Sequence, residues 1–104
     1  MSISTAENSS ARALGVTITE DSLTVELSDG RTISAPLAWY PRLLNGTAKE
    51  RNHWRPIGQG QGLHWPDLDE DISVNSLLEG KASGESQRSL KRWLDGRSSK
   101  DLIP

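Results

Sequence analysis

Two histidines and a run of acidic residues carry the side chains in this sequence with the richest chemistry. They are His53, His64, Asp67, Asp69, Glu70 and Asp71. Imidazole and carboxylate groups are common metal ligands, so one hypothesis is a metal-dependent enzyme built on these residues. The spacing matches neither a helical metal motif nor a zinc ribbon, because His64 and Asp67 are three residues apart and His53 lies eleven residues before His64.

The acidic run also invites comparison with calcium sites and with catalytic carboxylate pairs. A calcium loop would need glycine where Ile72 stands and a bidentate glutamate where Leu78 stands. A catalytic pair needs a buried cleft that shifts one pKa, and nothing in the sequence indicates one. We expect instead an acidic turn whose carboxylates favour the start of the following helix. The sequence therefore predicts no catalytic residue, no metal ligand and no cofactor.

Other catalytic patterns are absent from the sequence. The segment 58–62 alternates glycine and glutamine, but the phosphate-binding loops that it resembles require a helix immediately afterwards. Here His64, Trp65 and Pro66 follow, so we expect a flexible connector. There is no nucleophile-elbow motif around any serine, and the chain has no cysteine.

Tryptophan side chains are candidates for an interaction surface. Tryptophan and arginine anchor many protein interfaces, and Trp54 and Trp65 either belong to such a surface or fill a core that has little else in it. Trp93 lies on a short predicted helix, Gln87–Leu94, which must dock on its own domain or on a partner. The candidate interaction residues are His64, Trp65, Asp67, Asp69, Glu70, Asp71, Arg92 and Trp93.

The elements that position these residues follow from the hydrophobic pattern. Leu14–Ala35 alternates apolar and polar residues around turns, including Asp29-Gly30, and predicts a three-stranded antiparallel meander. A further strand is predicted near residues 54–57, and short helices are expected at Pro41, after Thr47 and after Ser73. The predicted fold class is α+β: a small antiparallel three- to four-stranded sheet with short helices packed on one face.

Length and composition indicate a single small domain. The chain has 104 residues, of which 34% are hydrophobic, and we divide it into three parts. Residues 1–12 are predicted to be a disordered arm, residues 13–80 the α+β domain, and residues 81–104 a linker with a short amphipathic helix. The absence of cysteine, of a secretory signal and of an apolar run of about 20 residues predicts a cytoplasmic protein that makes no membrane contact.

Charge is unevenly distributed along the chain, although the formal net charge is only −2. Residues 67–85 are strongly acidic, and residues 86–104 are basic. The overall charge gives no case for nucleic-acid binding. Arg42, Lys49, Arg51 and Arg55, together with the basic tail, nevertheless make a nucleic-acid-associated regulator the alternative hypothesis.

The residues from Gly58 to Gly80 resemble the C-terminal signature of the DUF2442 family, a bacterial domain of unknown function. The resemblance rests on Gly62-Leu63-His64-Trp65-Pro66, on Leu68-Asp69-Glu70-Asp71-Ile72, and on Leu77, Leu78 and Gly80. The Asp29-Gly30-Arg31 turn, the Leu37–Leu43 segment and the Asn52-His53-Trp54 step are similar too. Together these features extend from Ala13 to Gly80.

The resemblance implies a small α+β domain of bacteria or phages, found alone or fused to a helix-turn-helix domain, and it implies no catalytic residue. The residues after Gly80 are too few for such a fusion. Many members are encoded beside another short protein, in pairs interpreted as toxin–antitoxin modules. We therefore expect a non-enzymatic protein-interaction domain, the antitoxin-like partner of a small bacterial toxin-like protein, and leave its oligomeric state open.

Overall fold

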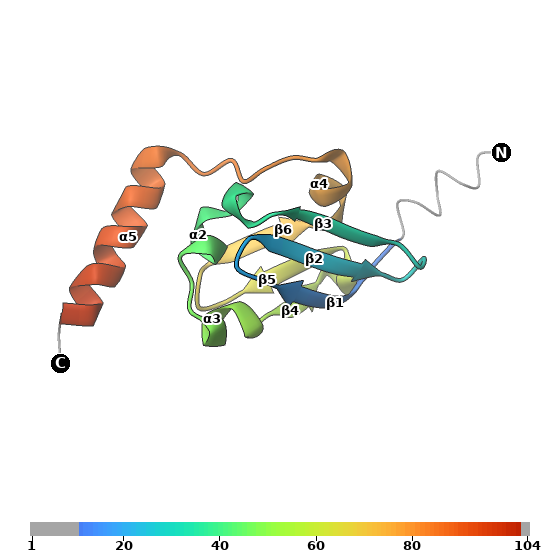
Figure 1. Ribbon diagram of the computed structural model, residues 1–104, viewed down its shortest axis with the longest axis horizontal. Coiled ribbons are helices and arrows are strands. Elements are labelled where there is room, and N and C mark those ends of the chain that lie inside the picture. The colour runs from blue at the N-terminus through green and yellow to red at the C-terminus, as the bar shows by residue number, and fades with distance from the viewer. Residues whose placement is uncertain (1–10, 103–104) are drawn as a thin grey trace.

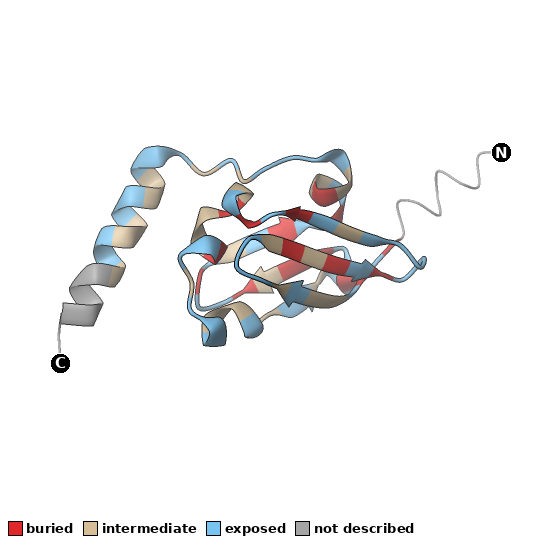
Figure 2. Ribbon diagram, viewed as in Figure 1, coloured by how far each residue is buried: buried red, intermediate tan, exposed pale blue. Residues whose placement is uncertain are grey.

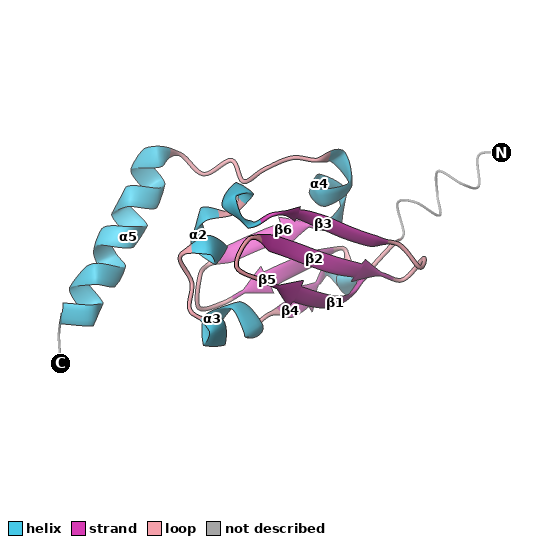
Figure 3. Cartoon of the chain, viewed as in Figure 1, coloured by secondary structure: helices cyan, strands magenta, loops and turns pink. Residues whose placement is uncertain are grey.

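Two small antiparallel sheets, packed face to face, form the body of the molecule (Figures 1 and 3). The computed structural model describes the backbone of residues 11–102, and side chains are described as far as Arg97. The first sheet has the order β1-β2-β3 and the second the order β4-β5-β6. The strands are β1 (Ala13–Ile18), β2 (Ser22–Leu27), β3 (Thr32–Pro36), β4 (Arg55–Ile57), β5 (Gly62–Trp65) and β6 (Glu70–Ser73).

The first sheet confirms the predicted meander. Val25 pairs with Val16 on one side and with Ile33 on the other, so apolar residues from all three strands share one face. The Asp29-Gly30 turn joins β2 to β3, and Gly30 has the φ of +94° that this turn requires. The register of β1 against β2 shifts between Ala13 and Gly15. This bulge leaves Leu14 exposed while Ala13 stays buried.

The second sheet adds two strands, β5 and β6, to the single sheet of three to four strands that the sequence predicted. Residues 70–71 were predicted to lie in an acidic turn, but the turn is confined to residues 66–69 and β6 begins at Glu70. Ile72 pairs with Leu63, and Glu70 pairs with Trp65. Pairing with β5 buries Ile72, and this long-range contact outweighs the poor strand propensity of the acids. The α+β class is confirmed, with its strands divided between two sheets.

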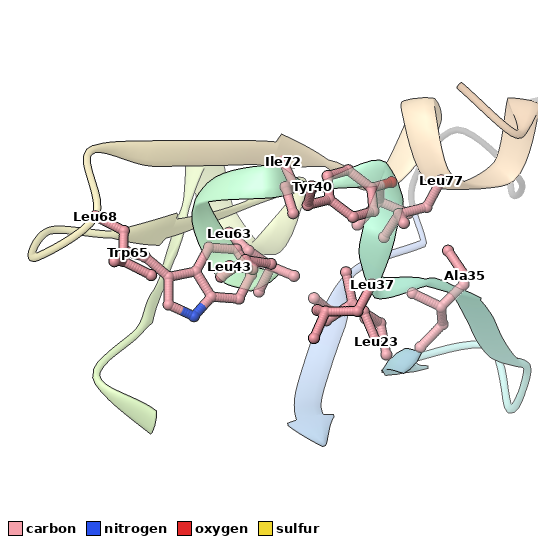
Figure 4. Packing of buried hydrophobic residues seen from close by; sticks show 14 of the residues in the cluster. Leu23, Ala35, Leu37, Tyr40, Leu43, Leu63, Trp65, Leu68, Ile72 and Leu77 are labelled. Atoms are coloured by element: carbon pink, nitrogen blue, oxygen red, sulfur yellow. The ribbon is translucent and has the colours of Figure 1, made fainter. Parts of the chain in front are cut away.

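A single hydrophobic core lies between the sheets and under the short helices (Figures 2 and 4). Leu23, Leu37, Leu63 and Leu68 are completely buried in it, and so is Trp65. The indole Nε1 of Trp65 donates a hydrogen bond to the carbonyl oxygen of Arg51 at 3.0 Å. This bond satisfies the one polar atom of the buried ring. The other three tryptophans are partly buried and pack against this core: Trp39, Trp54 and Trp93.

The short helices begin and end at the signals expected from the sequence. They are η1 (Leu37–Trp39), α2 (Pro41–Leu44), α3 (Ala48–Asn52) and α4 (Val74–Glu79). Thr47 caps α3, and Glu50 completes the capping box. Ser73 caps α4, and Gly80 ends it in the left-handed conformation. These local signals determine where the helices begin and end.

The glycine-rich segment is an ordered turn rather than the flexible connector that the sequence suggested. Its first three residues form η2 (Gly58–Gly60), which joins β4 to β5. Gly60 is buried at a φ of +89°, and a Cβ added there would lie 2.9 Å from the Cβ of Arg12. A side chain would therefore clash with the start of the first sheet, which explains the need for glycine at this position.

Beyond α4, a linker (residues 81–86) carries the chain to α5 (Gln87–Leu102), which stands at one end of the body (Figure 1). The sequence predicted a helix ending at Leu94, yet α5 continues through Gly96. The contacts of Trp93 and Arg97 described below hold this region helical despite the poor helix propensity of glycine. Most of the predicted N-terminal arm lies outside the described residues. Within residues 11–102, no helix is both long and apolar enough to cross a membrane.

Candidate functional site

One side of α5 is attached to the body by an aromatic side chain held between two arginines. Trp93 packs against the core. The guanidinium carbon of Arg42 lies 5.0 Å from the centre of its ring, and that of Arg97 lies 4.7 Å away. Such cation–π contacts add to the apolar packing of an indole. Ser89, Trp93 and Arg97 are each four residues apart, so they share the side of the helix that faces the body.

An ion pair near the middle of α5 fixes the helix to α3. Arg97 donates hydrogen bonds to both carboxylate oxygens of Glu50, at 3.0 and 2.8 Å. The same carboxylate accepts a hydrogen bond from the backbone N–H of Thr47. The bonds from Arg97 in the first place, and those from Thr47, lower the pKa of Glu50 to about 2. A capping residue of the body thus serves as the anchor for α5.

A second ion pair fixes the linker to α2. Arg42 donates to Glu85 through Nε at 2.9 Å and through Nη2 at 2.6 Å. Both side chains are largely buried, with 15% and 11% of their surface exposed. Ser89 of α5 donates a further hydrogen bond to Glu85. The hydrogen bonds from Arg42 hold the pKa of Glu85 below its usual value. We call this pair the Arg42–Glu85 latch.

The linker and β6 both line an open pocket of about 420 Å³. Three of the predicted site residues line it, namely Asp69, Glu70 and Asp71. The Oε2 atom of Glu70 is buried and makes no hydrogen bond within residues 11–97, where side chains are described. Burial raises the pKa of Glu70 to about 7, and this effect outweighs the attraction of Arg42. A carboxyl group with a raised pKa therefore lies in the pocket that the linker lines.

A second cavity, of about 470 Å³, lies between α5 and α3. It is lined by Asp67, Arg92 and Trp93 from the predicted site, together with Glu50 and Arg97. The structure thus brings most of the predicted residues to two neighbouring hollows, and Arg42 stands between them with contacts to both Glu85 and Trp93.

The two histidines occupy separate pairs instead of a shared centre. Nδ1 of His53 lies 2.8 Å from Oδ2 of Asp67, and Nδ1 of His64 lies 2.5 Å from Oδ1 of Asp71. His64 and Asp71 face each other across β5 and β6. Within the residues that the structure describes, no three histidine or acidic side chains gather into a metal-binding group. The arrangement that the metal hypothesis requires does not form there.

Trp65 was predicted to be part of an interaction surface, but this prediction is wrong. Its side chain is completely buried, because β5 turns the indole into the core where it can bond the carbonyl of Arg51. Its neighbour His64 keeps 22% of its side chain exposed and faces Asp71. The alternation of a strand accounts for the difference between these two adjacent residues.

Several functional contacts were not foreseen from the sequence. Arg42 was predicted to belong to a basic patch, but its guanidinium donates hydrogen bonds to Glu85, 43 residues away. Arg51 of the same patch donates to the carbonyl oxygens of Leu43 and Leu44. For the Arg42–Glu85 contact, the sequence signal is the opposite charge of residues 41–55, which are basic, and residues 67–85, which are acidic. That signal indicates attraction between the segments but cannot assign partners.

Comparison with known proteins places this body in a family. The model of DUF2442, described as a protein of unknown function, matches residues 13–83. The chain belongs to the DUF2442 family. It is similar to a protein of unknown function from Rhodospirillum rubrum, with 26% identity over 74% of this chain and 95% of the other and a TM-score of 0.62. No curated protein matches the chain.

A second solved structure shares the fold. The solution structure of an uncharacterized protein from Chromobacterium violaceum has a TM-score of 0.63, covers 88% of this chain and 84% of its own, and is 17% identical. The DUF2442 match ends within the linker. Three residues of the linker and α5 therefore lie beyond the matched residues: Glu85, Trp93 and Arg97. Arg42 and Glu50, which they contact, lie within the matched residues.

Proposed function

We propose that this DUF2442 protein is a non-enzymatic protein-interaction domain that binds another small bacterial protein through α5. The observation that carries the proposal is a half-buried apolar pair, Leu90 and Leu94, on α5. In the described part of the chain, the partly buried side chains that pack against the core include Trp93 but neither of these leucines. They line instead a hollow of about 410 Å³ along the helix.

Charge complementarity specifies the chemistry of the partner. Arg88 and Lys91 line the same hollow, with Asp95 at one end, and Arg92 is exposed beside them. A partner helix with an apolar stripe and acidic flanks fits this surface, since its carboxylates would meet the basic residues while its stripe covers the leucines. We therefore commit to an acidic amphipathic segment of a second protein as the occupant.

The polar groups near α5 support a binding role rather than catalysis. Arg42, Glu85, Glu50 and Arg97 bond to one another in pairs, and each pair attaches α5 or the linker to the body. Of the acids predicted to meet a partner, Asp67 and Asp71 are engaged by the two histidines, while the Asp69 side chain is 90% exposed. Asp69 is thus the most exposed of these acids, and its carboxylate lies 3.8 Å from Arg42.

An antitoxin-like role is the specific form of this proposal that the family resemblance implies. If the partner is a toxin-like protein, its expression alone should slow growth and co-expression of this chain should restore growth. A role as a nucleic-acid-associated regulator is the alternative, and no specific feature of the site favours it over docking. A metal-dependent enzyme built on the two histidines is disfavoured, because within the described residues they do not join three or more potential ligands in one group.

Site-specific photocrosslinking in bacterial cells tests the docking surface. A photoreactive residue replaces Lys91 in one variant and the exposed Thr17 of β1 in the control. We expect one discrete adduct at position 91 and none at position 17, with the captured protein carrying an acidic amphipathic helix. The purified pair should then bind with an affinity that weakens as salt rises. Only free monomer, or equal labelling at both positions, would refute the proposal.

A further inference from the structure

Glu70 has an environment that neither the fold nor the proposed docking surface explains. It begins β6 opposite Trp65, and its Oε2 atom is buried without a hydrogen-bond partner among the described side chains. Buried carboxylate oxygens normally find a donor, because an unpaired one costs free energy. The cost is tolerable only if the group is neutral or if the cover above it can open.

The linker lines the same pocket as Glu70, and it leads directly into α5. Residues 81–85 contribute to the wall of the cavity that Glu70 lines. The linker is held down by the Arg42–Glu85 latch and by the backbone bond from Ser83 N–H to the carbonyl oxygen of Trp39 at 3.0 Å. Since α5 follows the linker directly, opening the linker over Glu70 would also loosen the attachment of α5.

Burial makes the ionisation of Glu70 unfavourable in this closed arrangement, and the charged groups around it act in both directions. Those that line the cavity are Tyr40 and Arg42 from the α2 region, Asp69 and Asp71 from the second sheet, and Lys81 and Glu85 from the linker. From α4 only the hydroxyl of Ser76 lines it. Arg42 attracts an ionised Glu70 but is already bonded to Glu85, while Glu85 and Asp71 repel it. A negative charge on Glu70 thus acts against the latch.

We propose that the linker is a lid over Glu70, and that ionisation of this carboxyl group releases α5 from the body for docking to a partner. This inference rests on the proposed function, since it describes the regulation of the same helix. Release places Trp93 on the surface beside Leu90 and Leu94, at the helical spacing i, i+3 and i+4. A partner would then meet a wider apolar stripe than the docked helix offers.

The pH dependence of the lid follows from the signs of two pKa changes. The pKa of Glu70 is raised from its usual value of 4.5 to about 7, so the closed arrangement is favoured most below pH 4.5 and loses this advantage as the pH rises towards 7. The pKa of Glu85 is lowered, so the latch is present above pH 4.5 and is lost in stronger acid. The lid should therefore close best near pH 5.

Distance measurements between two spin labels test the lid without any partner. The chain has no cysteine, so labels can be attached to Thr17→Cys and Asp95→Cys alone. We expect one narrow distance distribution at pH 5 and a broader, longer one at pH 7.5. The ratio of open to closed molecules should rise on the order of a hundredfold. Identical distributions at the two pH values would overturn the proposal.

Variants separate the role of Glu70 from general loosening. The distance distribution of Glu70→Gln should stay narrow at both pH values, because the amide cannot ionise. The distribution of Glu85→Gln should be broad at both pH values, because this change removes the latch. Glu20→Gln, in an exposed turn, is the control and should behave like the parent chain. A pH response in Glu70→Gln equal to that of the parent would refute the assignment. Since no partner takes part, failure here leaves the photocrosslinking result standing, and the reverse also holds.

Discussion

Trp65 is the largest of the side chains that are fully buried in the described part of the chain. Its position shows how one residue can decide between two interpretations of a sequence. On the surface it would be an interface anchor, but in the core it closes the space between the sheets and bonds Arg51. The small apolar content of the chain favours the core, since few other side chains could fill that space.

We expect Trp65→Phe to destabilise the domain by about 2 kcal/mol, because the smaller ring leaves a void and the carbonyl of Arg51 loses its donor. Urea unfolding followed by circular dichroism measures the effect. Leu14→Ala is the control, since Leu14 is 66% exposed and should change the unfolding free energy by less than about 0.5 kcal/mol. Equal stability of Trp65→Phe and the parent chain would show that the indole is not a core anchor.

Glu50 provides a second test at the level of single residues. Its pKa of about 2 arises first from the hydrogen bonds donated by Arg97. In Arg97→Ala the pKa of Glu50 should rise towards the usual value of 4.5, because the hydrogen bonds that lower it most are lost. NMR titration of the Glu50 side-chain carboxyl carbon gives this value directly, with Arg88→Ala as the control. The contribution of the pair to stability should be present above pH 4.5 and lost as the pH falls towards 2.

At the level of elements, local signals were sufficient for the helices and the first sheet. Thr47 with Glu50, and Ser73 with Gly80, fix two helices by contacts within a few residues, and such contacts can be recognised in a sequence. Strand β6 could not be recognised, because Glu70 and Asp71 disfavour a strand until β5 pairs with them. The full length of α5 likewise depends on Glu50, which lies 47 residues before Arg97.

The turn between β4 and β5 gives a test of an element. Gly60→Ala should destabilise the protein by about 2 kcal/mol, because alanine is strained at positive φ and its methyl group would meet Arg12. Gly84→Ala in the linker is the matched control, since nothing lies within 4 Å of an added Cβ there. It should be neutral or stabilising by up to about 1 kcal/mol. Thermal unfolding compares both variants, and equal effects would contradict the assigned role of the turn.

At the level of the whole molecule, a family body carries a helix that lies outside the matched residues. Arg42 and Glu50 belong to the body. Arg42 contacts Glu85 of the linker and Trp93 of α5, and Glu50 pairs with Arg97 of α5. These contacts occupy one side of α5 and leave Leu90 and Leu94 outside the core. The sequence predicts the apolar spacing of this helix, but only the three-dimensional structure shows which of its side chains contact the body.

The central claim is that α5 binds a partner through Leu90 and Leu94. The most direct measurement is the calorimetric affinity, at pH 7.5, between the full chain and the protein captured at position 91. We expect Leu90→Ala/Leu94→Ala to weaken binding at least tenfold, while Leu14→Ala leaves it unchanged. An affinity equal to that of the parent chain in the double variant would contradict the account.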